Sequence, residues 1–306
     1  MPLRNRAILV ALAAGAVLAA QPAASSPYSD INAAAAADAI KVERVRGSVR
    51  MLSGSGGNIG VLSGGDGLLM VDAGIAVSEE KIKAALRSIG HGPVRYVIVT
   101  HWHWDHSDGN GWARRAGATV IADELAVRRL TQTIRVVEWD HTFTPVAKAD
   151  LPNQILAGDR TIRFDGETVK IRHYRSGHTD GDLSVYFVKA DVLQTGDTFW
   201  NGMYPFIDYV AGGSIDGAIR AANANLVMAA PRTLVIPGHG PIGNRAQLIA
   251  FRDMLVTIRA KVAELKARGQ SIDQVVAAKP TAAFDAEWGR SVISGALFTR
   301  LVYRGV

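Results

Sequence analysis

The sequence of 306 residues contains no cysteine. Disulfide bonds are therefore excluded, and so is a lipid anchor of the bacterial lipoprotein type, because that anchor requires a cysteine at the cleavage point. Stability must come from packing, helped by bound metal if there is any. Apolar residues make up 48% of the chain, which is enough for a large core, and one large domain is the simplest expectation.

Two further features are scarce: long hydrophobic runs and blocks of basic residues. No apolar stretch beyond the N-terminus is long enough to span a bilayer, so we do not expect an integral membrane protein. The net charge of +6 is spread along the chain without a Lys/Arg cluster, which argues against a nucleic-acid partner. A small-molecule substrate is the expected partner, and nothing in the sequence indicates an oligomeric state.

The N-terminus has the pattern of a secretory signal peptide over residues 1–25. Arg4 and Arg6 precede an apolar run that is too short to cross a membrane comfortably, and small residues follow it. Cleavage after Ala19 and cleavage after Ser25 both fit. Residues 26–40, with their alanine run, are expected to form a flexible mature N-terminus ahead of a domain over residues 41–306. The expected location is the periplasm or the medium.

Short β segments separated by glycine alternate with helical periodicity along the rest of the chain. Residues 135–156 show no clear period and are interpreted as a long loop. Strands are predicted at residues 42–49, 60–62, 68–72, 96–100, 119–122, 160–164, 168–174, 183–189, 192–194 and 233–236, and helices at 79–89, 109–115, 124–134, 215–228 and 245–268. Two β-rich halves, each followed by helices, predict a sheet-on-sheet core with helices outside.

A cluster of metal-binding side chains follows the apolar strand at residues 96–100. His101 and His103 point to the same side of an extended backbone, so that both imidazoles can reach one ion. Asp105 and His106 follow a predicted turn and can reach a second ion nearby. Few structural needs explain four such residues within six positions.

Three more candidate ligands each follow a predicted strand beside a glycine. These are His178, Asp197 and His239. Glycine lets the backbone bend sharply, so that each side chain can turn towards a shared centre. A single triplet of this kind is weak evidence, whereas the ordered set is strong.

This pattern resembles the metallo-β-lactamase superfamily over nearly all of the chain after the N-terminus. The resemblance implies an α+β fold, the αββα sandwich, with two metal ions at one edge of the packed sheets. It implies that His101, His103 and His178 bind the first ion, that Asp105, His106 and His239 bind the second, and that Asp197 bridges them. The donor set suits two zinc ions, and iron or manganese would also fit.

The implied chemistry is attack on a carbonyl by metal-bound hydroxide. Asp105 is expected to be catalytic, by orienting the nucleophile or carrying a proton. Asp72 resembles an early aspartate of the family and is expected to orient a metal ligand from behind; a polar strand terminus is the alternative interpretation.

The substrate class follows from departures within the family. The absence of cysteine and the presence of Asp197 make the ligand set more like that of glyoxalase II and lactonases than of the best-known zinc β-lactamases. We expect hydrolysis of a cyclic or activated ester or amide, with β-lactams and lactones both open. Aromatic residues are expected to line the substrate pocket: Trp139, Phe199, Tyr204, Phe206 and Tyr209. A phosphodiesterase and a non-catalytic periplasmic metal-binding protein are the alternatives.

Overall fold

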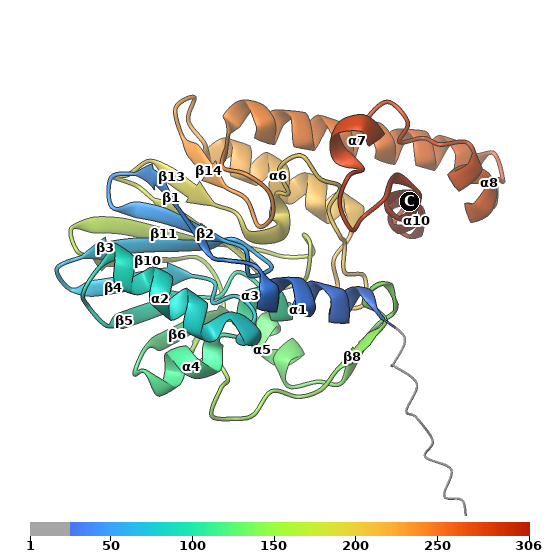
Figure 1. Ribbon diagram of the computed structural model, residues 1–306. Helices are drawn as coiled ribbons and strands as arrows, with labels where there is room; N and C mark the ends of the chain where they lie inside the picture. The colour runs from blue at the N-terminus through green and yellow to red at the C-terminus, as the bar shows by residue number, and fades with distance from the viewer. Residues whose placement is uncertain (1–24) are drawn as a thin grey trace, which may run out of the picture.

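The computed structural model describes residues 25–306 and has the predicted αββα architecture. Two β-sheets pack face to face. Helices α2 and α4 lie on one outer side, and α6 and α7 lie on the other (Figure 1). The expected signal peptide, apart from Ser25, lies outside the described residues.

The first sheet is built from the first half of the chain, in the order β1-β2-β3-β4-β5-β6-β9. Its first four strands form an antiparallel meander, and β5, β6 and β9 add in parallel. The strands are β1 (Lys41–Arg46), β2 (Val49–Ser53), β3 (Ile59–Gly64), β4 (Gly67–Val71), β5 (Val94–Ile98), β6 (Thr119–Asp123) and β9 (Gln154–Leu156).

The second sheet has the order β10-β11-β12-β13-β14-β15, and only its β13–β14 pair is parallel. A separate hairpin joins β7 (Ile134–Val136) to β8 (His141–Phe143). The sheet strands are β10 (Arg160–Phe164), β11 (Glu167–Tyr174), β12 (Asp182–Phe187), β13 (Val192–Gln194), β14 (Leu234–Ile236) and β15 (Gly243–Asn244).

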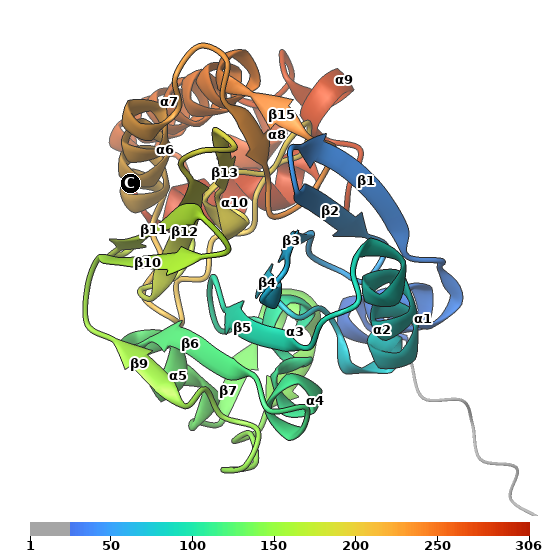
Figure 2. The ribbon, with the colours of Figure 1, turned by 90° about the vertical axis from the view of Figure 1, so that its left-hand side faces the viewer.

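Helices flank the two sheets, with α6 and α7 beside the second sheet and α2 and α4 beside the first (Figure 2). The α-helices are α1 (Pro27–Ala37), α2 (Glu79–Ile89), α3 (Trp104–Ser107), α4 (Asn110–Arg115), α5 (Glu124–Leu130), α6 (Ile215–Met228), α7 (Arg245–Ala267), α8 (Ile272–Ala277), α9 (Asp285–Trp288) and α10 (Gly295–Arg304). Three short 3₁₀ turns are η1 (Ala76–Ser78), η2 (Val137–Trp139) and η3 (Gly196–Thr198). None of the helices in residues 25–306 is both long and apolar enough to cross a membrane.

Successive side chains along a strand point to opposite faces of the sheet, and this divides the apolar core into layers. In β4, Leu69 and Val71 face the second sheet and join the cluster that includes Val185 and Phe187, whereas Leu68 and Met70 face α2. A strand with apolar residues on both faces is buried on both sides, which explains its continuous hydrophobic run. The packed layers hold the ends of strands from both halves at one edge.

The N-terminal segment differs from its prediction. The expectation of a flexible segment over residues 26–40 is wrong for residues 27–37, which form α1. Ser26 caps this helix by accepting a hydrogen bond from the Ser29 amide, and Pro27 occupies its first turn. Alanine has the highest helix propensity, but a run of alanines has no amphipathic period by which a helix could be recognised.

Two other predicted segments are more structured than expected. The strand predicted at residues 42–49 is a hairpin, because Gly47 takes a positive φ of 56° and turns the chain between β1 and β2. The loop predicted at residues 135–156 contains the β7–β8 hairpin and β9. Elements of three residues are too short to show a period.

A histidine-aspartate pair links the two halves of the sandwich. His173 on β11 places its Nδ1 2.5 Å from Oδ2 of Asp123 at the end of β6, and this hydrogen bond raises the pKa of His173. A raised folded-state pKa stabilises the protein fully below the unfolded value of about 6.5, and the contribution is lost as pH rises through the folded value.

We therefore predict that His173→Gln destabilises the protein most at acidic pH. Urea unfolding between pH 5.5 and 9 should show a difference from the wild type that shrinks as the pH rises. His91→Gln, which changes an exposed histidine outside the sandwich, is the control. A difference that stayed constant across this range would contradict the proton-linked pair.

Candidate metal centre

The seven predicted ligands meet where strands from both sheets end. His101 and His103 follow β5, and Asp105 and His106 lie in the single turn of α3. His178 follows β11, Asp197 lies in η3 after β13, and His239 follows β14. Because β13 and β14 are parallel, their carboxyl ends deliver Asp197 and His239 to the same edge.

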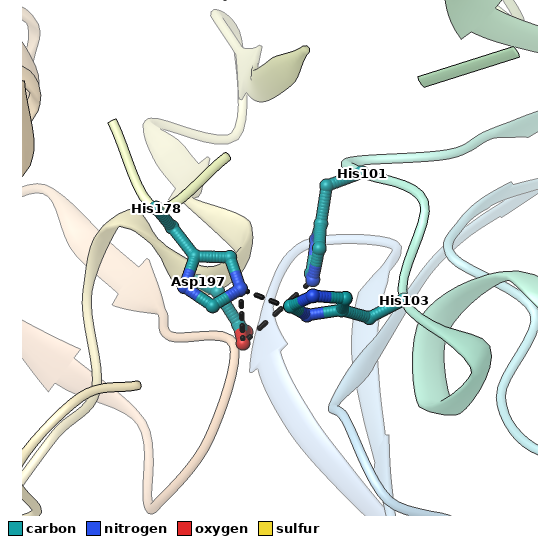
Figure 3. A group of neighbouring side chains, drawn as sticks. All are labelled: His101, His103, His178 and Asp197. Atoms are coloured by element: carbon teal, nitrogen blue, oxygen red, sulfur yellow. Dashed lines mark hydrogen bonds and ion pairs between the residues drawn. The ribbon is translucent and has the colours of Figure 1, made fainter. Parts of the chain in front are cut away.

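Four of these side chains form one group: His101, His103, His178 and Asp197 (Figure 3). Each offers a ligand atom, and these atoms all lie within 4.8 Å of one another. Nε2 of His178 is 2.9 Å from Nδ1 of His103 and 3.4 Å from Oδ2 of Asp197. The three imidazoles therefore present one nitrogen each towards a common point.

Asp105, His106 and His239 form a second group of the same compactness. Nε2 of His239 is 3.3 Å from Oδ2 of Asp105. Asp197 contacts this group too, since its Oδ1 is 3.1 Å from Nε2 of His106 and its Oδ2 is 3.5 Å from Nε2 of His239. Its two oxygens thus face both groups, which is the position predicted for a bridging ligand.

The protonation states expected here suit cation binding. Burial, reinforced by His106, holds the pKa of His101 well below its usual value, and burial lowers that of His178 to about 4. Burial opposes the charge on Asp197, yet His239 and His106 outweigh it and hold the pKa of Asp197 well below its usual range. His101 and His178 are thus held in the neutral form that binds a metal ion. Burial opposes the charge on His106 and His239, yet Asp197 and Asp105 outweigh it and raise the pKa of both, that of His239 to about 9, so these two imidazoles would release a proton when an ion binds.

Buried polar atoms without partners test the fit of a metal ion. Nε2 of His101 and Oδ1 of Asp197 make no hydrogen bond among the described residues, although Oδ1 of Asp197 lies 3.1 Å from Nε2 of His106. Such atoms are costly in a folded protein unless something unseen satisfies them. The nitrogen and oxygen donors fit divalent metal ions, and each group of side chains could hold one.

Two buried aspartates hold histidines from behind. Asp72 places Oδ2 2.9 Å from Nδ1 of His106, and it also accepts hydrogen bonds from the amide and hydroxyl of Thr100 at 2.7 and 2.9 Å. Asp72 therefore lies where an orienting residue is expected. It adopts a positive φ of 68°, a conformation that aspartate tolerates better than most residues.

The second of these aspartates, Asp208, was not found by sequence reasoning. Its Oδ2 is 2.9 Å from Nε2 of His103 and accepts a hydrogen bond from Nε1 of Trp102 at 3.2 Å. With Nε2 of His103 occupied by this contact, its Nδ1 faces the first ligand group, 2.9 Å from Nε2 of His178. A charged residue directly after the apolar pair Phe206 and Ile207 was the available signal.

Two glycines allow the backbone to approach the ligands closely. A Cβ on Gly57 would lie 2.1 Å from the ring of His106, and one on Gly238 would lie 2.0 Å from Oδ1 of Asp197. Both distances are far below van der Waals contact, so a larger residue at either position would displace a ligand.

A cavity of about 400 Å³ opens onto both ligand groups. Of the predicted pocket residues, Trp139 and Phe206 line it. The prediction is wrong for the other three, which lie in the helical core. Phe199 packs against Phe251, and Tyr204 stacks on Phe298 with ring centroids 4.9 Å apart. Tyr209 packs against the hydrophobic cluster to which these residues belong. An aromatic-rich segment is not periodic, so the sequence does not show which rings turn towards the cavity.

The rest of the lining is mostly apolar, with Asp38, Arg290 and Ser291 as its further polar members. Trp104, Trp200 and Met203 border the cavity, as does α1. Trp200 also lies against the ring of His239, with centroids 4.2 Å apart. Both ligand groups therefore border a mostly apolar cavity that is large enough for a small organic molecule.

We predict that Asp197→Ala lowers the metal content below that of the wild type, for which about two ions per chain are expected. This carboxylate belongs to the first ligand group, and its oxygens also face His106 and His239 of the second, so its removal should weaken both sites. Elemental analysis of the purified protein measures the change, with Asp216→Ala on α6 as the control, because Asp216 pairs with Arg259 and belongs to neither ligand group. A full complement of metal in Asp197→Ala would contradict the bridging position.

Asp208→Asn should weaken metal binding by roughly 10- to 100-fold, the usual range for a residue that orients a ligand. The amide can no longer fix His103 with its Nδ1 towards the metal group. Chelator competition measures the affinity, and Asp253→Asn on α7 serves as the matched control. Equal affinities for Asp208→Asn and the wild type would remove Asp208 from the centre.

Comparison with known proteins agrees with this geometry. The family model described as the metallo-beta-lactamase superfamily matches residues 52–239. No curated protein matches the sequence.

Solved structures share the fold at low sequence identity. The inverting sec-alkylsulfatase Pisa1 from Pseudomonas sp. matches 87% of this chain and 50% of its own, with 16% identity and a TM-score of 0.65. This chain thus spans about half the length of the alkylsulfatase. The DIM-1 metallo-beta-lactamase matches 72% of this chain and 98% of its own, with 20% identity and a TM-score of 0.57. The metallo-beta-lactamase from Pontibacter korlensis matches 71% and 99%, with 20% identity and a TM-score of 0.56.

The family model covers more than half of the chain, and the matched residues include every member of the two ligand groups. The chain therefore belongs to the metallo-beta-lactamase superfamily.

Proposed function

We propose that this protein is an exported hydrolase with two zinc ions, which opens a cyclic or activated ester or amide such as a lactone or a β-lactam. The observation that carries the proposal is the meeting of seven side chains of metal-binding type beside a mostly apolar cavity. Export rests on the signal-peptide pattern of residues 1–25.

Zinc is the metal we propose because it accepts imidazole and carboxylate ligands. His101, His103 and His178 would hold one ion, and Asp105, His106 and His239 the other, with Asp197 shared. Iron and manganese suit the same donors. When bound, such ions supply Lewis acidity and make a water molecule acidic enough to act as a nucleophile near neutral pH.

The side chains around this centre have separate tasks. Asp105 lines the cavity as well as the second ligand group, so its carboxylate is placed to orient a nucleophile or accept its proton. Asp72 and Asp208 fix the directions of His106 and His103. Trp139 and Phe206 form an apolar wall that excludes water and holds the substrate's apolar part.

The size of the cavity favours a small organic substrate over a polymer, and its lining is mostly apolar but also includes Asp38, Arg290 and Ser291. A space of about 400 Å³ accommodates a ring with one substituent. The solved relatives include β-lactamases and an alkylsulfatase, so sulfate esters join lactones, β-lactams, thioesters and phosphodiesters as test substrates.

The deciding experiment measures metal content and turnover on the same sample of mature protein. Two zinc ions with turnover of a lactone or of nitrocefin would support the proposal and identify the ring. Turnover of a phosphodiester or sulfate ester alone would replace the proposed substrate class. Bound metal without turnover of any substrate would indicate a non-catalytic metal-binding protein.

We predict that Trp139→Ala raises KM for the best substrate while leaving the metal content unchanged. The indole lies against Phe206 in the cavity wall, with ring centroids 4.9 Å apart, and neither ligand group includes it. Loss of an aromatic wall should cost binding on the order of tenfold. Trp112→Phe, in the core beside α2, is the control. An unchanged KM in Trp139→Ala would exclude this wall from substrate binding.

A further inference from the structure

The cavity beside the metal centre is not built by the family region alone. The family model matches residues 52–239, whereas α1 lies before this range. Ile31, Ala34 and Ala35 of α1 line the cavity together with Trp104 and Trp139. Part of the cavity wall therefore comes from a segment that the family model does not match.

Polar contacts fasten the C-terminal end of α1. The hydroxyl of Ser78 donates a hydrogen bond of 3.0 Å to the carbonyl of Ala35. Nζ of Lys81 donates to the carbonyls of Ala35, Ala36 and Asp38. These carbonyls belong to the last turn of the helix and just beyond it, where backbone acceptors lack partners within the helix. The contacts tie α1 to η1 and α2.

An aromatic stack fastens the other end. The ring of Tyr28 lies on that of His141 in β8, with centroids 3.6 Å apart and planes at 11°. It also contacts Trp104 and Phe143, with centroids at 5.1 and 5.6 Å. Since both ends are held, α1 is a fixed wall and not a loose terminal extension.

Two of the three residues through which α1 lines the cavity are alanines. Residues 31, 34 and 35 share one helix face, because positions three and four apart are neighbours on a helix. Ala35 is 3% exposed and packs against the protein, whereas Ala34 is exposed beside the cavity. The methyl group at position 34 thus leaves room that a larger side chain would fill.

We propose that α1 is the specificity-determining wall of the pocket and that Ala34 sets the size of the apolar substituent accepted next to the scissile bond. The substrate class is then a ring that carries an extended alkyl or aryl group. This inference rests on the proposed function, in that the substituent belongs to the molecule hydrolysed at the metal centre. Its test is designed to be independent of turnover.

The experiment compares Ala34→Phe with Ala33→Phe in the zinc-loaded mature protein. Both changes add a phenyl ring to an exposed alanine of the same helix, but only Ala34 lines the cavity. The probes are 2-hexylcyclopentanone and cyclopentanone, cyclic ketones that resist hydrolysis. Binding is followed by tryptophan fluorescence, because Trp104, Trp139 and Trp200 line the cavity.

We expect Ala34→Phe to weaken binding of the hexyl ketone by at least about tenfold, as crowding of several methylenes in an apolar pocket implies. Ala33→Phe should stay within about twofold of the wild type, and both variants should keep their metal. Equal binding by Ala34→Phe and the wild type, equal losses in both variants, or no binding of the hexyl ketone by the wild type would overturn the proposal.

A second variant tests the wall without filling the pocket. Lys81→Met removes the ammonium group that holds the last carbonyls of α1, and should lower the preference for the hexyl ketone over cyclopentanone while metal content is retained. If the ketones bind as expected but no cyclic substrate is hydrolysed, the proposed function is contradicted while the role of α1 is supported. If cyclic substrates are hydrolysed but the change at position 34 has no effect on binding, only the proposed role of α1 is contradicted.

Discussion

The Asp197 carboxylate is the group around which the centre is arranged. It is 5% exposed, and its oxygens lie 3.1 Å from Nε2 of His106 and 3.4 Å from Nε2 of His178. A buried carboxylate is costly unless positive charge or hydrogen-bond donors surround it. Its partners come from both halves of the chain, so the two sheets must be held in register to within a fraction of an ångström. The layered apolar core between β4 and β12 provides that rigidity.

Precision at the centre also depends on groups that never face the cavity. Asp72 and Asp208 each contact the imidazole nitrogen opposite to the one that faces the ligand group, which decides the tautomer of His106 and His103. Gly57 and Gly238 keep the space beside His106 and Asp197 clear of side chains. The ligands come from the ends of four strands, and they can converge because the two aspartates orient the imidazoles and the two glycines leave space beside the ligands.

Sequence reasoning was strongest where chemistry and periodicity coincide. His101, His103, Asp105 and His106 follow an apolar strand, and no ordinary packing requirement explains them, so the fold and the metal centre could be predicted together. The lining of the pocket could not be predicted in this way. Phe199, Tyr204 and Phe206 are all buried aromatic residues, and only the direction of each ring decides whether it lines the cavity. Asp208 contributes through a single contact across the fold, and α1 shows no amphipathic pattern. Such features depend on tertiary packing and leave little trace in local sequence.

The attachment of α1 has a consequence for how this protein can diverge. The helix joins neither sheet; hydrogen bonds from Ser78 and Lys81 to its carbonyls hold one end, and an aromatic stack holds the other. Backbone carbonyls are the same for every residue type, so mutations on the face of α1 that borders the cavity leave most of the attachment intact. Substitutions there can reshape the pocket without touching the buried ligands, so the shape of the substrate wall and the geometry of the ligand groups can change independently.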